Sequence, residues 1–103
     1  MAGDFEWVDL GPSGLRATAI RLPRAEMGFL KHLYESWEGV AITRTVATLA
    51  STDEIVAAIV CTPDFEAQAD AILIDHVQRS AADFGPEALP SSCREDWFLR
   101  EWS

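Results

Sequence analysis

The chain has 103 residues, of which nearly half are apolar, and a net charge of −9. This length fits one domain with its own hydrophobic core. Acids outnumber bases throughout, by eight to five in residues 1–63 and by nine to three in residues 64–103. Such a charge repels phosphate backbones and disfavours direct nucleic-acid binding, whereas it keeps a protein soluble and can serve a basic protein partner.

The two cysteines and the first residues bear on where the protein is found. Cys61 and Cys93 are far apart and neither belongs to a CxxC pair. The N-terminal residues lack the basic and apolar segments of an export signal, and no apolar run approaches the ~20 residues of a membrane span. We therefore expect a cytoplasmic protein with reduced thiols and no membrane association.

The first element expected is a short strand over residues 5–10, because polar and apolar side chains alternate there and place Phe5 and Trp7 on one side. Residues 11–14 are turn formers. They lead into a second strand over residues 15–22. The two segments are therefore predicted to be strands joined by a tight turn.

A helix is expected to begin at Pro23, whose ring fits the first helical position, and to end at Gly39. Its interior shows apolar side chains at helical spacing, while Lys31 and Glu35 fall outside that stripe. The stripe consists of Met27, Leu30, Leu33, Tyr34 and Trp37. The spacing predicts an amphipathic helix that packs on a sheet.

Two strands are expected next, over residues 40–49 and 54–62, as the arms of a hairpin. The first arm is rich in β-branched residues. Residues 55–61 of the second arm are apolar at every position, which is typical of a central strand covered on both faces.

A second helix is expected from Thr62, its N-cap, to about Ser80. Its buried face is predicted to comprise Phe65, Ala69, Ile72, Leu73 and Val77. We expect the domain to cover residues 1–85. Residues 86–103 form a separate tail, in which a capping box precedes Trp97 and a short amphipathic helix is predicted.

This β-α-β-β-α order predicts an α+β domain of ferredoxin-like arrangement that lacks its last strand. The strand over residues 54–62 is expected between the two parallel strands, and both helices on one face of the sheet. Residues 5–10 are expected to occupy the edge left vacant beside residues 15–22. The other face needs a cover, which favours a homodimer.

The segment from Trp37 to Val46, the hairpin, and the run from Val60 to Asp64 with the acidic helix after it resemble an uncharacterised family of short bacterial proteins. The resemblance covers residues 15–79. Such domains look ACT-like, and ACT domains are regulatory modules that bind amino acids or other small ligands at a dimer interface. The usual acidic-x-Pro-Gly turn of ACT domains is only partly matched, because Pro23 is present without the glycine.

Arg44 is the leading candidate for ligand binding. It shares its strand register with Val40, Ile42 and Val46, and a charged group among apolar side chains needs a partner. Its guanidinium is suited to a carboxylate or phosphate of a small anionic metabolite. The alternative is a structural ion pair with a glutamate of the first helix or with a second subunit.

Three further residues join Arg44 as ligand-binding candidates. Thr45 is its neighbour in the strand, with an ordinary strand role as the alternative. Arg21 and Arg24 flank the strand-to-helix turn where the ACT resemblance implies a ligand, with solvated turn charges as the alternative.

No nucleophile elbow, phosphate loop, dinucleotide motif or metal-ligand spacing is present, so neither an enzyme nor a metal or cofactor site is expected. The leading interpretation is a non-catalytic small-ligand-binding or regulatory module that acts as a dimer. The alternative is a protein-interaction domain that uses its acidic surface and Trp-rich tail. An acidic decoy of a nucleic-acid-binding partner is a special case of that alternative.

Overall fold

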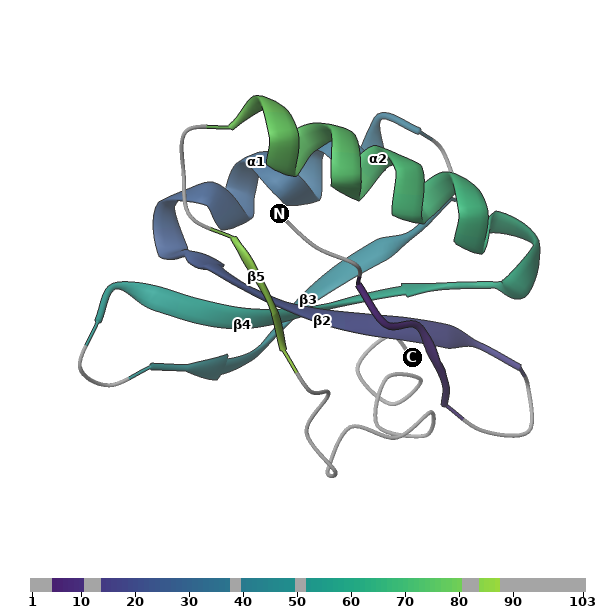
Figure 1. Cartoon of the computed structure of the whole chain (residues 1–103), viewed down its shortest axis with the longest axis horizontal. Coiled ribbons are helices and arrows are strands. Elements are labelled where there is room, and N and C mark those ends of the chain that lie inside the picture. The colour runs from purple at the N-terminus through teal and green to yellow at the C-terminus, as the bar shows by residue number, and fades with distance from the viewer. Residues whose placement is uncertain (1–4, 11–13, 38–39, 50–51, 81–83, 88–103) are drawn as a thin grey trace.

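The computed structural model describes five stretches of the chain, namely residues 5–10, 14–37, 40–49, 52–80 and 84–87. They form a mixed α+β structure in which two helices lie on one face of an open, antiparallel, five-stranded sheet (Figure 1). The elements in chain order are β1 (Val8–Asp9), β2 (Arg16–Pro23), α1 (Arg24–Glu35), β3 (Ile42–Thr48), β4 (Glu54–Cys61), the 3-10 turn η1 (Pro63–Phe65), α2 (Glu66–Arg79) and β5 (Gly85–Glu87).

The central strand of the sheet is β4, as its uninterrupted apolar sequence predicts. It pairs with β2 along its whole length on one side and with β3 on the other, both antiparallel. Every residue of β4 after Glu54 is buried. The predicted placement of this strand between β2 and β3 is confirmed, and the arrangement is compatible with a ferredoxin-like fold.

The outer edge of β2 is shared by two short strands. β1 pairs with its first half, where Val8 lies opposite Ala17, so the predicted N-terminal edge strand is confirmed but is only two residues long. β5 pairs with the second half, where Gly85 lies opposite Arg21. The expectation of a missing last strand is therefore wrong. This strand was not predicted because it contains Pro86, and a proline argues against a strand since it has no N–H to donate. Proline is tolerated in edge strands such as β5.

Helix α1 buries most of the predicted stripe, but Trp37 is 48 % exposed. Leu30 and Tyr34 are buried, and Met27 and Leu33 pack partly buried against the core. The helix begins one residue later than expected, because Pro23 is the N-cap and ends β2. It ends at Glu35, so Trp37 lies in the turn that follows, with its N–H donating to the Tyr34 carbonyl. The expected end at Gly39 lies outside the described residues.

Helix α2 buries Ala69, Leu73 and Val77, as predicted, with Ile72 partly buried beside them. Phe65 was expected on this face and is instead 38 % exposed. The reason is that Pro63–Phe65 form a tighter 3-10 turn, which changes the direction of Phe65 relative to the α-helical stripe. Thr62 precedes that turn without a side-chain capping bond.

The sheet face opposite the helices is lined by small apolar side chains that are buried within a single chain. They are Ala17, Ala19, Val56, Ala58 and Val60, none more than 6 % exposed. Leu10, Leu15 and Val46 pack against part of this set. The homodimer expected from an uncovered face stays a prediction.

The sheet continues through Glu87, two residues beyond the domain boundary expected at residue 85. The rest of the predicted tail, residues 88–103, and its amphipathic helix lie outside the described residues. Neither helix in the described ranges has the length and apolar character that crossing a bilayer requires.

Candidate functional site

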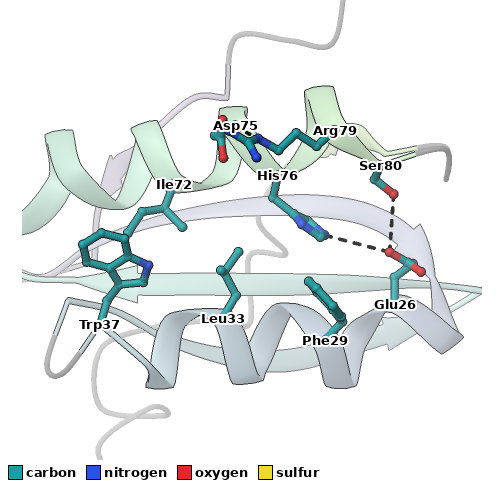
Figure 2. Close-up of a pocket in the computed structure, with 9 residues that line it drawn as sticks. All are labelled: Glu26, Phe29, Leu33, Trp37, Ile72, Asp75, His76, Arg79 and Ser80. Carbon is teal, nitrogen blue, oxygen red and sulfur yellow. Dashed lines mark hydrogen bonds and ion pairs between the residues drawn. The ribbon is translucent and has the colours of Figure 1, made fainter.

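A groove of about 500 Å³ runs between α1 and α2 on their outer surface. Helix α1 and the turn after it form one wall, and α2 forms the other (Figure 2). We call this the α1–α2 groove. It is lined by Glu26, Phe29, Leu33, Trp37, Ile72, Asp75, His76, Arg79 and Ser80. Small-molecule sites in proteins have volumes of about 300–1,000 Å³, so this groove is of ligand size.

The α1 wall of the groove is apolar and exposed. Phe29 is 61 % exposed and Trp37 is 48 % exposed, with Leu33 between them. The three residues recur every four positions, so they line one side of α1 and its C-terminal turn. Ile72 lies opposite on α2 (Figure 2). Aromatic side chains left in water beside a cavity mark a surface that gains stability when a ligand or partner covers it.

One end of the groove is polar and centred on His76. The imidazole stacks on Phe29, with ring centroids 5.1 Å apart, and meets the edge of Phe84 at 5.4 Å. These two rings hold it in place. Its Nε2 is buried and has no hydrogen-bond partner among the described residues. A buried polar atom without a partner is rare in proteins and calls for an explanation such as a binding site.

The nearest acid to that atom is Glu26. Its Oε1 lies 3.9 Å from His76 Nε2, too far for a hydrogen bond, and accepts a weak one from Ser80 Oγ at 3.5 Å (Figure 2). On the rim, Arg79 donates to Asp75 at 3.0 Å, so these two charges neutralise each other. Glu26 therefore leaves this end of the groove with a net negative charge while His76 is neutral.

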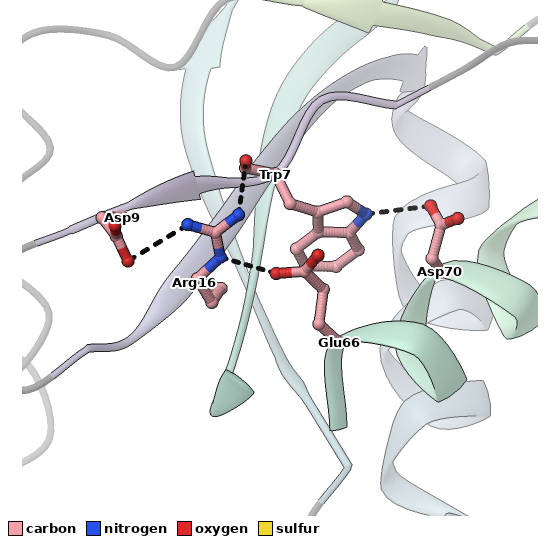
Figure 3. A network of polar contacts seen from close by, with 5 residues as sticks. All are labelled: Trp7, Asp9, Arg16, Glu66 and Asp70. Atoms are coloured by element: carbon pink, nitrogen blue, oxygen red, sulfur yellow. Dashed lines mark hydrogen bonds and ion pairs between the residues drawn. The ribbon is translucent and has the colours of Figure 1, made fainter. Parts of the chain in front are cut away.

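The opposite flank of α2 carries a second polar group, which we call the Arg16 cluster: Trp7, Asp9, Arg16, Glu66 and Asp70 (Figure 3). The Arg16 guanidinium donates from Nε to Glu66 at 2.6 Å, from Nη1 to Asp9 at 3.1 Å and from Nη2 to the Trp7 carbonyl at 3.0 Å. The Trp7 indole donates to Asp70 at 2.9 Å. The cluster ties β1 and β2 to α2.

Each of the three nitrogens of the Arg16 guanidinium meets an acceptor of the same chain. The hydrogen bond to Glu66, followed by that to Asp9, raises the pKa of Arg16 further above its already high value. A cation whose three nitrogens each meet an acceptor of the same chain links the elements that carry those acceptors. We interpret the Arg16 cluster as structural.

Two buried titratable groups lie near this flank. Tyr34 donates from its hydroxyl to the Ala69 carbonyl at 2.7 Å, which links α1 to α2, and burial raises its pKa. Burial, with a smaller contribution from Glu66, raises the pKa of the Cys61 thiol to about 11. The thiol therefore stays protonated at neutral pH, which makes it a poor nucleophile.

Two of the four predicted ligand-binding residues, Arg21 and Arg24, come together at one end of the sheet. Arg21 pairs with Glu54 at 2.6 Å, and Arg24 lies 3.5 Å from the Asp53 carboxylate. The acids follow one another at the start of β4, a placement that the sequence positions alone do not reveal. These contacts assign both arginines a structural partner, and ligand binding by them stays a prediction.

Arg44 and Thr45 lie elsewhere, on the edge strand β3. Their opposite neighbours on β4 are Ala58 and Ala57, so the two side chains point to opposite faces of the sheet. A bulge in β3 follows directly after Thr45, and bulges protect sheet edges from further pairing. A smaller cavity of about 190 Å³ includes Arg44 in its lining. The four predicted residues therefore do not form one site.

The residues of the α1–α2 groove were not predicted as a site. The exposed Phe29 falls outside the apolar stripe of α1, and a lone exposed aromatic carries little weight by itself. His76 has Asp75 beside it but no second ligand three or four positions on, and Glu26 is fifty positions away. The described part of the chain also holds no group of three His, Cys, Asp or Glu side chains able to bind a metal ion.

Comparison with known proteins yields no family to which the chain can be assigned. No protein-family model, no curated protein and no solved structure matches it. Functional interpretation therefore rests on the geometry of the site itself.

Proposed function

We propose that this protein is a non-catalytic module that binds a small ligand in the α1–α2 groove. The observation that carries the proposal is a cavity of ligand size whose apolar wall displays Phe29 and Trp37 to solvent. Covering apolar surface contributes about 25 cal/mol per Å², so a ligand seated on these rings gains affinity from burial alone. The Nε2 of His76, which no described residue hydrogen-bonds, supplies a polar point of recognition in the same groove.

The proposal keeps the ligand-binding function expected from the sequence and moves its site. An ACT-like regulatory domain would bind its ligand near the turn after the first strand, where Arg21 and Arg24 already have carboxylate partners. The α1–α2 groove lies on the outer surface of the helix layer instead. A dimer is compatible with this site, since the sheet edges and the opposite face remain outside it.

A non-catalytic role is supported by the groups present. The described thiol, Cys61, is buried and held protonated by its raised pKa. Besides the Asp75–Arg79 pair the groove has one imidazole and one acid, Glu26, and no hydroxyl or thiol of the described residues bonds the Nε2 of that imidazole. Nucleophilic catalysis requires such a pair within hydrogen-bond reach.

The test is a titration of the whole protein, labelled with nitrogen-15, with tryptophol, a neutral indole alcohol. We expect saturable shifts at backbone amides of the groove and at the Trp37 indole N–H. Replacing Phe29→Ala or Trp37→Ala removes one apolar wall contact and should weaken binding about tenfold, which corresponds to about 1.4 kcal/mol.

Phe65→Ala is the matched control, because Phe65 is an exposed aromatic outside the groove. Its affinity for tryptophol should equal that of the unaltered protein. Shifts centred on another surface, or equal weakening by Phe65→Ala and Phe29→Ala, would contradict the proposed site.

A second candidate function is docking of a protein segment on the same surface. Phe29, Leu33 and Trp37 recur at intervals of four, the spacing that an amphipathic partner helix would match. The net charge of −9 favours a basic segment. A flat titration with tryptophol together with saturable binding of a basic amphipathic peptide at these residues would favour docking over ligand binding.

A further inference from the structure

The polar end of the α1–α2 groove provides two facing acceptor positions. Glu26 Oε1 and His76 Nε2 lie 3.9 Å apart and both point into the space between the helices (Figure 2). A single ligand atom at ordinary hydrogen-bond distance from both would sit between them, with an angle near a right angle at that atom. One group that carries two or more hydrogens can therefore satisfy both positions at once.

The charge around this position selects among the groups that fit it. The charges of Asp75 and Arg79 cancel on the rim, so Glu26 makes the net charge of this end of the groove negative. Its carboxylate is about one-third exposed and its nearest basic group is the imidazole of His76. A protonated amine gains a charge-assisted hydrogen bond here, whereas a carboxylate or phosphate would meet repulsion.

The imidazole is fixed so that it can accept a hydrogen bond from such an amine. Stacking on Phe29 and the edge contact with Phe84 hold the ring plane, and the side chain is only 11 % exposed. In the tautomer that carries its proton on Nδ1, Nε2 presents a lone pair to the groove. A ligand nitrogen would then supply the partner that this buried atom lacks.

We infer that the ligand of the α1–α2 groove is an apolar amine, a cation whose ammonium group bridges Glu26 and His76 and whose apolar body lies along Phe29, Leu33 and Trp37. This inference rests on the proposed function and adds the chemical class of the ligand. The expected charge of the ligand is thereby reversed, because the arginines in the sequence predicted an anionic metabolite.

The experiment compares three probes with the same indole ring and linker: tryptamine, tryptophol and indolepropionate. They present an ammonium, a hydroxyl and a carboxylate, and each is titrated into the whole labelled protein at neutral pH. We expect tryptamine to bind at least tenfold more tightly than tryptophol, and indolepropionate to bind more weakly than either.

Two variants test whether Glu26 and His76 cause the preference for tryptamine. Glu26→Gln keeps the shape and removes the charge, so tryptamine affinity should fall about tenfold to the level of tryptophol. His76→Phe keeps the ring contacts and removes the acceptor, so it should weaken tryptamine more than tryptophol. Glu35→Gln is the control, because it removes an exposed acid from the same helix outside the groove and should leave the order of the probes unchanged.

The outcomes separate this inference from the proposed function. If all three probes bind in the groove equally, or if Glu26→Gln leaves the tryptamine preference intact, the amine class is overturned and ligand binding stands. If tryptophol or indolepropionate binds most tightly, the amine class is likewise overturned. If none of the probes shifts the resonances of the groove, the proposed function itself fails.

Discussion

The two flanks of α2 carry polar groups of opposite kinds. In the Arg16 cluster, three donor positions of one guanidinium and the Trp7 indole all meet acceptors of the same chain. In the α1–α2 groove, the buried Nε2 of His76 has no hydrogen-bond partner in the described part of the chain, and two aromatic side chains remain in water. A satisfied network stabilises the fold, whereas an unsatisfied atom beside an open cavity is available to a ligand. The same helix thus has a structural flank and a flank that we propose binds a ligand, called the binding flank below.

The largest effect is expected where the structural flank is broken. Trp7→Ala removes a half-buried aromatic side chain and its hydrogen bond to Asp70, and should lower the free energy of unfolding by about 2–3 kcal/mol. Trp7→Phe keeps the packing and should lose about 1 kcal/mol. Urea denaturation measures both. Tryptophol affinity should be unchanged, and a loss of binding in Trp7→Phe would show that the two flanks are not independent.

A smaller effect is expected at the link between the helices. Tyr34→Phe removes the hydroxyl that donates to the buried Ala69 carbonyl, which keeps only its helical donor, and should lower the free energy of unfolding by about 1 kcal/mol. Ser36→Ala is the matched control, because its hydroxyl bonds the Leu33 carbonyl at an exposed position on the same segment. Its effect should stay under about 0.5 kcal/mol. Equal losses in the two variants would argue against a special role for the buried bond.

The exposed side of α1 should tolerate, and even gain from, a helix-favouring change. A Cβ added at Gly28 meets nothing within 4 Å, so Gly28→Ala should raise the free energy of unfolding by about 0.5–1 kcal/mol. Gly14→Ala is the contrasting control, because the positive φ of 79° at Gly14 strains any side chain, and it should be destabilised. Thermal denaturation of both variants measures these changes, and a loss of stability in Gly28→Ala would contradict the prediction.

The smallest effect on stability is expected in the binding flank. Phe29→Ala and Trp37→Ala remove side chains that are about half exposed or more, and should change the free energy of unfolding by under about 0.5 kcal/mol. The same variants are expected to lose tryptophol affinity. Denaturation curves beside the titrations check this separation. A large loss of stability in both variants would show that these rings stabilise the fold, which contradicts their assignment to a binding site.

Much of the fold could be predicted because its signals are local. The apolar spacing of Leu30 and Tyr34 identified the buried side of α1, and the unbroken apolar run in β4 identified the central strand. Phe65 was misplaced, since a proline-led 3-10 turn has a different period from the helix that it precedes. β5 was missed because three residues around Pro86 carry no strand pattern of their own.

The candidate site could not be predicted in the same way. Arg44 was predicted because a cation among apolar strand residues needs a partner, and Arg21 and Arg24 because they flank the turn where the ACT resemblance implies a ligand. The sequence does not show that Glu54 and Asp53 lie beside Arg21 and Arg24. The groove depends on contacts between Glu26 and His76 and between Phe29 and His76. These pairs are distant in the sequence, and only the packing of two helices brings them together.

The sequence by itself determined the kinds and order of the main elements, the side of each helix that is buried and the negative charge of the whole. Those properties follow from periodicity and composition, which are summed over neighbouring residues. Tertiary structure alone decided that β1 and β5 share one edge of β2, that the arginines of that region are paired, and that His76 faces Glu26 across an apolar groove. The physical reason is that partner choice for a charge or a ring depends on distances set by packing, which no local pattern records.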